Sequence, residues 1–407
     1  MRFLALLATF SLVLGAQEAS AEIRSKALAI HHRLFTLDTH CDTPMRMSDR
    51  WDVGVRHEPG KRTSGTQDLV RMKEGGLDAS FFAVFVGQGP RTETGNQAAW
   101  EKANAVLDRL DRMFAQHSDL CGRATTPAEG KRLAQAGKRA IFLGLENGYP
   151  LGTSVERVDH FFRRGVRYIT LAHTADNDLA ASSTEERDRP DGGLTDLGRK
   201  VVARMNDLGM VVDVSHISDQ AFADVLKVSR APVMASHSCA RAIADHPRNL
   251  TDDQLRALKK NGGVIQLCIL GDYIKPPAAD SGRRKAERDL RRRVQALGGW
   301  QNLKDPKVIA GFEREWEALI EDYRHELPTV KDAVDHIDHI VKVIGIDHVG
   351  IGTDFDGGGG LRDCSDVTHL PRITEELLRR GYREADLAKI WGGNALRVLE
   401  AARRVAR

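Results

Sequence analysis

The 407-residue sequence has few aromatic residues, few cysteines and no excess of charge of one sign. Only 6% of its residues are aromatic, and its 60 Lys and Arg are nearly balanced by 57 Asp and Glu, which gives a net charge of +3. No long basic block is interleaved with aromatic residues, so a nucleic-acid-binding surface is not indicated. With 41% hydrophobic and 29% charged residues, the composition is that of a soluble globular protein and excludes a disordered or collagen-like chain.

Disulfide frameworks, repeats and linkers are also lacking. The cysteines show no dense or regular spacing, and their odd number leaves at least one thiol unpaired within the chain. They are Cys41, Cys121, Cys239, Cys268 and Cys364. Because no linker or composition shift divides the sequence, we expect residues 22–407 to form a single domain.

The only long apolar run lies at the N-terminus. Arg2 precedes the apolar residues 3–15, and Ala19-Ser-Ala21 then offers a small-residue cleavage site. This pattern predicts a secretory signal peptide over residues 1–21, because the run is shorter than the about 20 residues of a spanning helix. An uncleaved membrane anchor is the alternative. Cleavage would give an exported protein, periplasmic or secreted, and the polar residues 400–407 carry no lipid-anchor signal.

Short apolar runs alternate with longer amphipathic segments along the rest of the chain. Eight runs rich in Val, Ile, Leu and Phe predict strands at 34–42, 77–86, 140–147, 168–174, 210–216, 232–238, 263–269 and 349–356. Helical patterns lie between them, as at 97–117, 155–164, 194–208, 219–229 and 252–260. This alternation indicates βαβ units and a parallel sheet, and eight strands favour an α/β fold of the (β/α)8 TIM-barrel type.

One charged segment interrupts this alternation. Residues 275–324 predict a helical insertion between strands seven and eight, which could serve as a lid or a partner surface. A solvated helical face without a specific role is the alternative. Residues 372–381 and 384–405 predict C-terminal helices.

Histidine and carboxylate side chains follow the predicted strands. In a barrel of this type the active site lies at the carboxyl ends of the strands. The first strand ends at His40 and Asp42, which point to the same face because side chains alternate along a strand. Cys41 points to the other face, where we expect it to be buried and inert. A His and a carboxylate on one inward face are ligands that divalent metal ions accept.

Three further strand ends carry residues of the same kinds. The third predicted strand ends at Glu146, the fifth at His216 and the sixth at His237. The two histidines are 21 residues apart, about one β-α unit, so we expect them at equivalent positions of adjacent strands. A single zinc site needs three protein ligands, whereas five ligands with Glu146 between them suit two metal ions about 3.5–4 Å apart.

Three other residues are expected at the same mouth. His173 ends the fourth strand, Asp354 ends the eighth, and Arg248 follows the sixth. An imidazole there could stabilise a developing oxyanion, a carboxylate could shuttle a proton, and an Arg could hold a substrate carboxylate. A loop-capping His, a turn Asp and a surface salt bridge are the alternatives for these residues.

Several of these motifs together resemble the membrane (renal) dipeptidases. The motifs are Asp38-Thr-His-Cys-Asp42, Leu145-Glu-Asn147, Thr170-Leu-Ala-His173, Val212-Asp-Val-Ser-His216, Ser236-His-Ser238, Arg248-Asn249, Asp335-His-Ile-Asp-His-Ile340, Gly352-Thr-Asp-Phe-Asp-Gly357 and Gly393-Asn-Ala-Leu-Arg-Val398. They occur in order over nearly the whole chain after residue 21. The resemblance implies an amidohydrolase-type barrel with two zinc ions that hydrolyses dipeptides through a metal-bridging hydroxide.

The resemblance also implies a role for each candidate residue. His40 and Asp42 would bind one zinc ion, and Glu146 would bridge it to a second ion bound by His216 and His237. His173 and Arg248 would bind the substrate, and His173 would also take part in catalysis. Asp354 would be catalytic too and would transfer the proton. Asp356 would support the site from behind.

Other functions stay open at this stage. The same barrel could hydrolyse a β-lactam, a lactone or a phosphotriester, or the chain could be a non-catalytic exported binding protein. A site made of two imidazoles and a carboxylate suits iron and manganese as well as zinc. The segment after Lys275 matches the family poorly. A homodimer is compatible with the sequence, which decides neither the side-chain nor the D/L preference of a dipeptide.

Overall fold

Eight parallel strands form a nearly closed barrel, as the sequence predicted. The computed structural model describes residues 21–48, 50–58, 64–185, 192–299, 303 and 305–407. The strands follow the order β1-β2-β4-β5-β6-β7-β8-β9. They are β1 Leu37–Cys41, β2 Ala79–Phe85, β4 Arg139–Glu146, β5 Val166–Thr170, β6 Val211–Asp213, β7 Met234–Ser238, β8 Val264–Leu267 and β9 Val349–Ile351. A parallel bridge between Cys41 and Phe355 brings the first and last strands together, and the Asp42 N–H donates to the Phe355 carbonyl at 2.7 Å.

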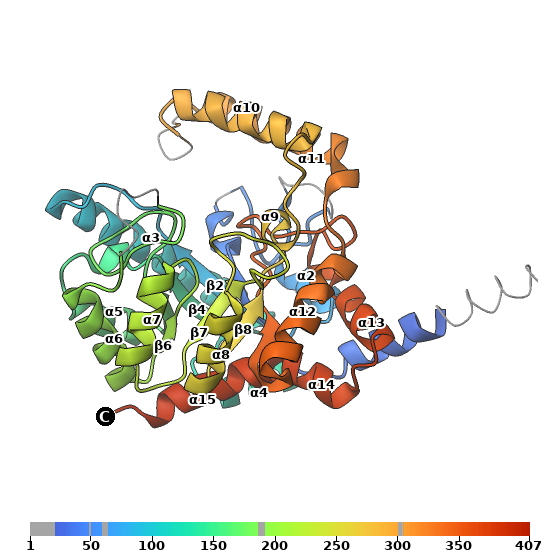
Figure 1. The fold of residues 1–407 in the computed structure, drawn as a ribbon, viewed down its shortest axis with the longest axis horizontal. Helices are drawn as coiled ribbons and strands as arrows, with labels where there is room; N and C mark the ends of the chain where they lie inside the picture. Colours follow the sequence, from blue (N-terminus) through green and yellow to red (C-terminus); the bar gives the residue numbers. More distant parts are fainter. Residues whose placement is uncertain (1–20, 49, 59–63, 186–191, 300–302, 304) are drawn as a thin grey trace, which may run out of the picture.

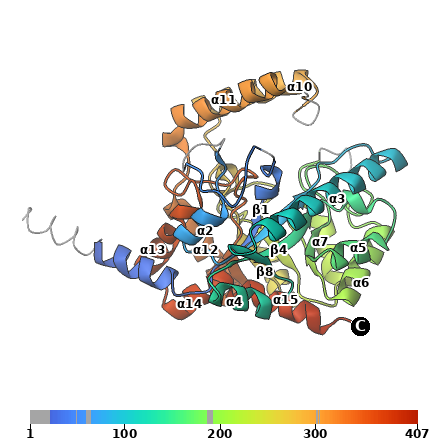
Figure 2. The ribbon, with the colours of Figure 1, turned by 180° about the vertical axis from the view of Figure 1, so that it is seen from behind.

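Helices follow the strands and cover the outside of the barrel (Figures 1 and 2). They are α2 Leu69–Glu74, α3 Glu93–Gln116, α4 Pro127–Gln135, α5 Arg157–Arg163, α6 Asp196–Leu208, α7 Asp219–Val228, α8 Asp252–Asn261 and α12 Val330–Ile344. Most begin where a Ser, Thr or Asp side chain accepts a hydrogen bond from the first helical turn, as Thr251 does before α8. Such caps satisfy N–H groups that have no partner within the helix.

All the predicted strands except the one at 140–147 are shorter in the structure, and one observed strand was not predicted. β6 ends at Asp213, so His216 lies in the loop that follows it, and His173 likewise lies beyond the end of β5 at Thr170. The additional strand β3, Cys121–Arg123, pairs with the start of β4. Its three residues are too few to show a period in the sequence.

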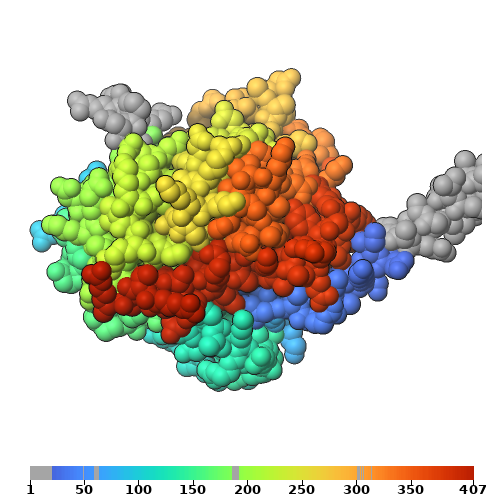
Figure 3. Space-filling model, turned by 60° about the horizontal axis from the view of Figure 1, so that its bottom comes forward, coloured from blue at the N-terminus to red at the C-terminus, as the bar shows by residue number. Residues whose placement is uncertain are grey.

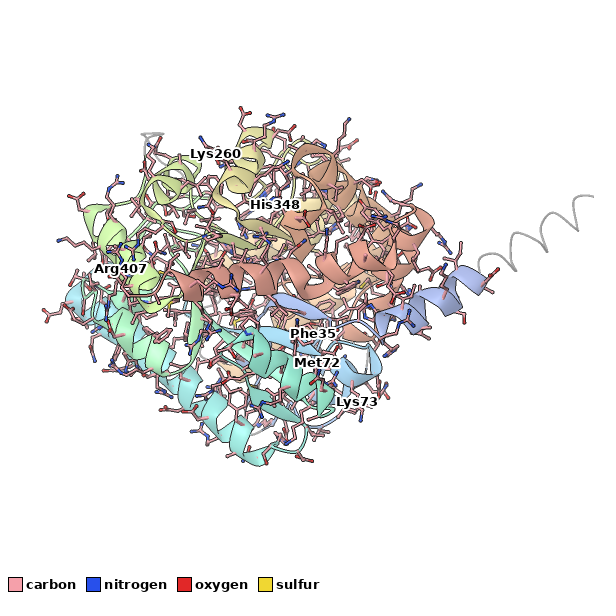
Figure 4. The ribbon with its side chains drawn as sticks, turned by 90° about the horizontal axis from the view of Figure 1, so that it is seen from below. Phe35, Met72, Lys73, Lys260, His348 and Arg407 are labelled. Atoms are coloured by element: carbon pink, nitrogen blue, oxygen red, sulfur yellow. The ribbon has the colours of Figure 1, made fainter. Side chains whose placement is uncertain are left out.

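The barrel interior is filled by side chains from alternate strand positions. Leu37, Phe81, Phe142, Tyr168 and Met234 form one buried cluster, while the residues between them face the surrounding helices. Helix α15 (Asn394–Arg404) packs on this cluster through Leu396 and Leu399 and closes the amino ends of the strands. The C-terminal residues, in red, form a band across this face in Figure 3, and Figure 4 shows α15 crossing the barrel from below.

The predicted insertion is a pair of helices that stands above the mouth of the barrel (Figure 1). Short helix α9 (Gly271–Ile274) leads into α10 (Gly282–Ala296) and α11 (Pro306–Asp322). At the base of this pair, Arg283 donates to Glu287 at 2.8 Å and to Asp272 at 3.0 Å. The insertion therefore belongs to the carboxyl end of the barrel.

The C-terminal helices differ from the prediction in one respect. α13 (Pro371–Arg379) agrees with it, but the predicted helix 384–405 consists of α14 (Glu384–Ala388), a wide turn at Lys389–Gly393 and α15. The backbone of Gly392 is not helical in that turn, with φ 174°. Trp391 is fully buried beside it and donates to Thr374 at 2.8 Å.

The remaining expectations concern the N-terminus and the thiols. The predicted signal peptide lies outside the described residues apart from Ala21, and residues 21–31 are helical. Within the described part of the chain, no helix is long and apolar enough to cross a membrane. All five cysteines are buried free thiols. Burial raises the pKa of Cys41 to about 12, so this thiol has little nucleophilic character.

Candidate metal centre

A bulge in β1 turns His40 toward the mouth of the barrel. In the pairing of β1 with β2, the three steps from Asp38 to Cys41 oppose only two steps, from Ser80 to Phe82. This extra residue changes which face the side chains occupy. Leu37 therefore belongs to the barrel interior and Cys41 to the outer cluster, while His40 lies over the interior.

Four non-glycine residues with left-handed backbone follow the strands at this mouth. They are Asn147, His216, Asp354 and Asp356, with φ between 63° and 74°. Such residues are uncommon and are found where surrounding contacts hold them in place, often at functional sites. Asn147, for example, donates to the Val86 carbonyl at 3.0 Å and accepts from Asn177 at 2.9 Å, which fixes the turn after Glu146.

The carboxylate of Glu146 lies between His40, which faces one of its oxygens, and the pair His216 and His237, which faces the other. Its Oε2 is 3.4 Å from His40 Nε2, while its Oε1 is 3.2 Å from His216 Nε2 and 3.6 Å from His237 Nε2. Asp42 Oδ2 approaches the same His40 Nε2 atom, at 3.6 Å. One carboxylate thus presents a separate oxygen to each group, which is the arrangement of a ligand shared by two ions.

The donor atoms form three overlapping groups that could hold metal ions. Within each group the atoms lie within 4.8 Å of one another. The groups are His40 with Glu146 and His237, Glu146 with His173 and His216, and His40 with Asp42 and Asp354. The structure therefore brings the five predicted ligands together with His173 and Asp354 at one place.

Several of these atoms have the properties of metal ligands. His40 Nε2 and Asp42 Oδ1 are buried and have no hydrogen-bond partner among the described residues. His40 Nδ1, by contrast, is 2.8 Å from the Tyr168 hydroxyl, which leaves Nε2 as the atom that faces the carboxylates. Gly357 adds space, since a Cβ there would lie 2.2 Å from oxygens of both Asp42 and Asp354. Buried polar atoms rarely lack partners, so this donor set of imidazole nitrogens and carboxylate oxygens fits divalent metal ions.

Burial and mutual repulsion control the charges of the carboxyl groups. Burial raises the pKa of Glu146 to about 7, and the nearby Asp42 carboxylate adds to this rise. Burial likewise raises the pKa of Asp354 well above its usual value. Carboxylates packed this closely need positive charge near them to stay ionised, which divalent ions would supply.

The imidazoles fall into two classes. Burial lowers the pKa of His216 and of His237 well below the usual value, and it lowers the pKa of His173 to about 3. These three rings are therefore neutral, which is the form that binds metal. Burial opposes charge on His40 too, but the Tyr168 hydroxyl and the Glu146 carboxylate outweigh it and raise the pKa of His40 well above its usual value.

The structure places the three remaining predicted residues around this cluster. His173 Nε2 lies 3.6 Å from Glu146 Oε1, and its ring packs edge-on against Phe85. Asp354 Oδ1 lies 3.9 Å from His40 Nε2. Arg248 is buried behind the cluster, where it donates to the His237 carbonyl at 2.9 Å while its Nε has no partner among the described residues.

A cavity of about 880 Å³ opens from the metal-ligand cluster to the helical insertion. Its inner end is lined by Asp42, Glu146, His173, His216 and Asp354, and its outer end by residues of α10 and α11 that include Arg291 and Trp316. The volume lies in the range of about 300–1,000 Å³ that is common for small-molecule sites. Asp356 joins two walls of this cavity, because it accepts from Thr43 Oγ1 at 2.9 Å and from the Thr66 N–H at 2.8 Å.

Some residues of the site were not identified from the sequence. Tyr168 begins the apolar run 168–174 and received no role in the sequence analysis, although its hydroxyl lies 2.8 Å from His40 Nδ1. Tyr273 packs its ring under the Arg248 guanidinium at 5.3 Å. Asp213 lies inside an apolar run. A carboxylate within such a run was the only sign in the sequence that this residue has a role. The contacts of Tyr168 and Asp213 depend on the pairing of neighbouring strands, which the sequence of one strand does not show.

Fold and site together define the class. A (β/α)8 barrel with a cluster of imidazole and carboxylate ligands at the carboxyl ends of its strands is typical of metal-dependent hydrolases. Residues 24–407 match the family model of membrane dipeptidase, peptidase family M19. The chain belongs to this family, as its motifs predicted.

Two curated relatives and one solved structure agree with this assignment. Dipeptidase 3 of Macaca fascicularis is 33% identical over 394 residues, which cover 94% of this chain and 68% of that protein. Dipeptidase tcpJ of Claviceps purpurea is 32% identical, covering 88% of this chain and 74% of that protein. The crystal structure of the probable dipeptidase PvdM from Pseudomonas aeruginosa superposes with a TM-score of 0.78 at 31% identity, covering 95% of this chain and all of that one.

Proposed function

We propose that this chain is a zinc-dependent dipeptidase that uses two metal ions to hydrolyse the peptide bond of dipeptides. The position of Glu146 carries this proposal, because its two oxygens face different histidines. Oε2 lies 3.4 Å from His40 Nε2, and Oε1 lies 3.2 Å from His216 Nε2. Family membership and the names of the relatives support the dipeptide as substrate. The nitrogen and oxygen donors support zinc, which prefers such ligands.

Five residues would hold the two ions. His40 and Asp42 would bind the first, His216 and His237 the second, and Glu146 would contact both. Bound there, the ions would supply a water molecule activated for attack near neutral pH and would polarise the peptide carbonyl. Because the ligating imidazoles must be neutral, the low pKa of His216 and of His237 favours binding at the second position.

The surrounding residues would handle the proton and the substrate. Asp354, whose Oδ1 lies 3.9 Å from His40 Nε2, would take the proton from the attacking water and pass it to the departing amine. His173, neutral and at the cavity wall, would donate a hydrogen bond to the oxygen of the scissile carbonyl. Arg248 would hold the C-terminal carboxylate of the dipeptide, as the family resemblance implies, and its buried guanidinium beside the His237 carbonyl would have to turn toward the cavity to do so.

The test combines metal analysis with a substrate panel. Purified protein should contain two zinc equivalents and hydrolyse L-L and L-D dipeptides, and exhaustive chelation should abolish this activity until zinc is restored. Glu146→Gln should lose at least one equivalent, whereas Glu156→Gln, which changes an exposed Glu bonded to Ser154, should behave as wild type. Hydrolysis that survives chelation would refute the proposal. If the protein hydrolysed a β-lactam, lactone or phosphotriester faster than any dipeptide, that compound would be its substrate instead.

We also propose that the protein is exported after removal of residues 1–21. The short positive and apolar start with its small-residue cleavage site supports this. Sequencing the N-terminus of protein recovered from the native host should find Glu22 first. Recovery of the full-length chain in the membrane fraction would favour the uncleaved anchor instead.

A further inference from the structure

Asp213, at the end of β6, is a fully buried carboxylate with four hydrogen-bond donors around it. Its Oδ1 accepts from the backbone N–H groups of Ser215 at 3.0 Å and Ser236 at 2.9 Å. Its Oδ2 accepts from Thr170 Oγ1 at 2.5 Å and from Ser236 Oγ at 2.6 Å. A carboxylate in these surroundings acts only as an acceptor.

The Ser236 hydroxyl connects this carboxylate to one of the candidate metal ligands. A hydroxyl has a single hydrogen, which Ser236 donates to Asp213, so its oxygen can only accept from His237 Nδ1, 2.8 Å away. The proton of the neutral His237 ring therefore resides on Nδ1. The lone pair is on Nε2, which lies 2.8 Å from His216 Nε2 and 3.6 Å from Glu146 Oε1.

We propose that Asp213 and Ser236 are positioning residues that hold His237 in its Nδ1–H form and aim its Nε2 at the second metal ion. This inference rests on the proposed binuclear site. Both side chains are fully buried, so they act through His237 rather than by contacting the substrate. Partners of this kind orient ligating imidazoles and contribute about 10–100-fold to metal affinity.

The other two histidine ligands are supported differently. His40 Nδ1 contacts the Tyr168 hydroxyl at 2.8 Å, and His216 Nδ1 has no hydrogen-bond partner among the described residues. The Asp213–Ser236 pair therefore serves one ligand of one ion. Changes to it should weaken one of the two bound ions, not both.

The Asp213→Asn substitution should reverse the hydrogen-bond direction. The two backbone N–H groups at the Oδ1 position require the amide oxygen there, which places the NH2 group opposite Ser236 Oγ. The NH2 would donate to Ser236, whose hydroxyl would then donate to His237 Nδ1 and shift the ring proton to Nε2, the ligating atom. Ser236→Ala only removes the hydrogen bond that holds the ring proton of His237 on Nδ1, without favouring Nε2. Its loss of metal affinity should therefore be smaller than that of Asp213→Asn.

The first experiment is a zinc titration against a competing chromophoric chelator. Wild type should bind two ions, Asp213→Asn should bind one of them about 10–100-fold more weakly, Ser236→Ala should show a smaller loss, and Ser236→Thr should restore affinity. Thr374→Val is the matched control, because it removes an equally buried hydroxyl that contacts His31 at the opposite end of the barrel. Wild-type affinity for both ions in Asp213→Asn and Ser236→Ala would overturn the proposal.

The second experiment locates the His237 ring proton directly, and its wild-type arm does not depend on the folding of any variant. Long-range ¹H–¹⁵N spectra of metal-free wild type should show the His237 proton on Nδ1, and those of Asp213→Asn should show it on Nε2. A wild-type proton on Nε2 would overturn the proposal. Wild type that binds fewer than two ions would refute the binuclear site, and the position of the His237 proton would then decide this inference alone.

Discussion

Gly357 occupies a position at the candidate metal centre where no side chain fits. A Cβ at this residue would lie 2.2 Å from Asp42 Oδ2 and 2.2 Å from Asp354 Oδ1. Real Cβ atoms essentially never approach other atoms closer than 3.0 Å, so in Gly357→Ala the new Cβ and each carboxylate oxygen must separate by a further 3.0 − 2.2 = 0.8 Å or more. We expect this movement to take Asp42 away from the first metal position and Asp354 away from the proton it transfers.

The size of the effect follows from this displacement. A misplacement of about 1 Å at a reacting centre can cost about 100-fold in rate, or about 2.7 kcal/mol of transition-state stabilisation. Stability should change little, because Gly357 is exposed at the mouth and its substitution disturbs no core contact. We therefore expect a fall of about 100-fold in kcat/KM together with weaker zinc binding, at nearly unchanged unfolding free energy.

Steady-state hydrolysis of a dipeptide, zinc titration and urea unfolding would measure these three quantities. Gly311→Ala is the matched control, since the added Cβ has no atom within 4 Å and lies in helix α11, where Ala is preferred to Gly. If Gly357→Ala kept wild-type kcat/KM and zinc affinity, the space above Asp42 and Asp354 would have no role in catalysis, and the reasoning would be wrong.

Two further predictions concern stability. Burial lowers the pKa of His31 to about 3, against 6.5 in the unfolded chain. The neutral ring, which contacts Thr374 Oγ1 at 2.8 Å, therefore stabilises the fold above pH 6.5, and this stability is lost as the pH falls toward 3. At pH 5, about 1.5 pH units below the unfolded pKa, the lost stability is about 2 kcal/mol. Urea unfolding should show that, between pH 7.5 and 5, His31→Gln loses about 2 kcal/mol less unfolding free energy than wild type. Equal losses in the two proteins would show that His31 is not the source of this pH dependence. Phe142→Ala should cost about 3–5 kcal/mol of unfolding free energy because Phe142 is fully buried inside the barrel and stacks on Phe81 at 5.0 Å; a cost below about 1 kcal/mol would show that the interior collapses around the missing ring.

Much of the architecture could be predicted because parallel barrel strands are buried on both faces. Such strands appear in sequence as continuous apolar runs, and all eight runs correspond to strands of the barrel. The limits of the runs were predicted less well. β6 ends at Asp213, three residues before the predicted end at His216, because its pairing with β5 and β7 stops at Asp213. The left-handed backbone of His216 then turns the chain away from the strand direction.

The sequence by itself determined the type of barrel and the identity of the residues at its mouth. A polar residue that ends an apolar run can be read locally, and this is how His40, Glu146 and His237 were found. Tertiary structure decided how those residues are aimed. The β1 bulge that turns His40 inward depends on pairing with β2, and the support of His237 by Asp213 joins two strands. Side-chain orientation at a strand end is set by register and by hydrogen bonds between neighbouring strands, and a single strand's sequence contains neither.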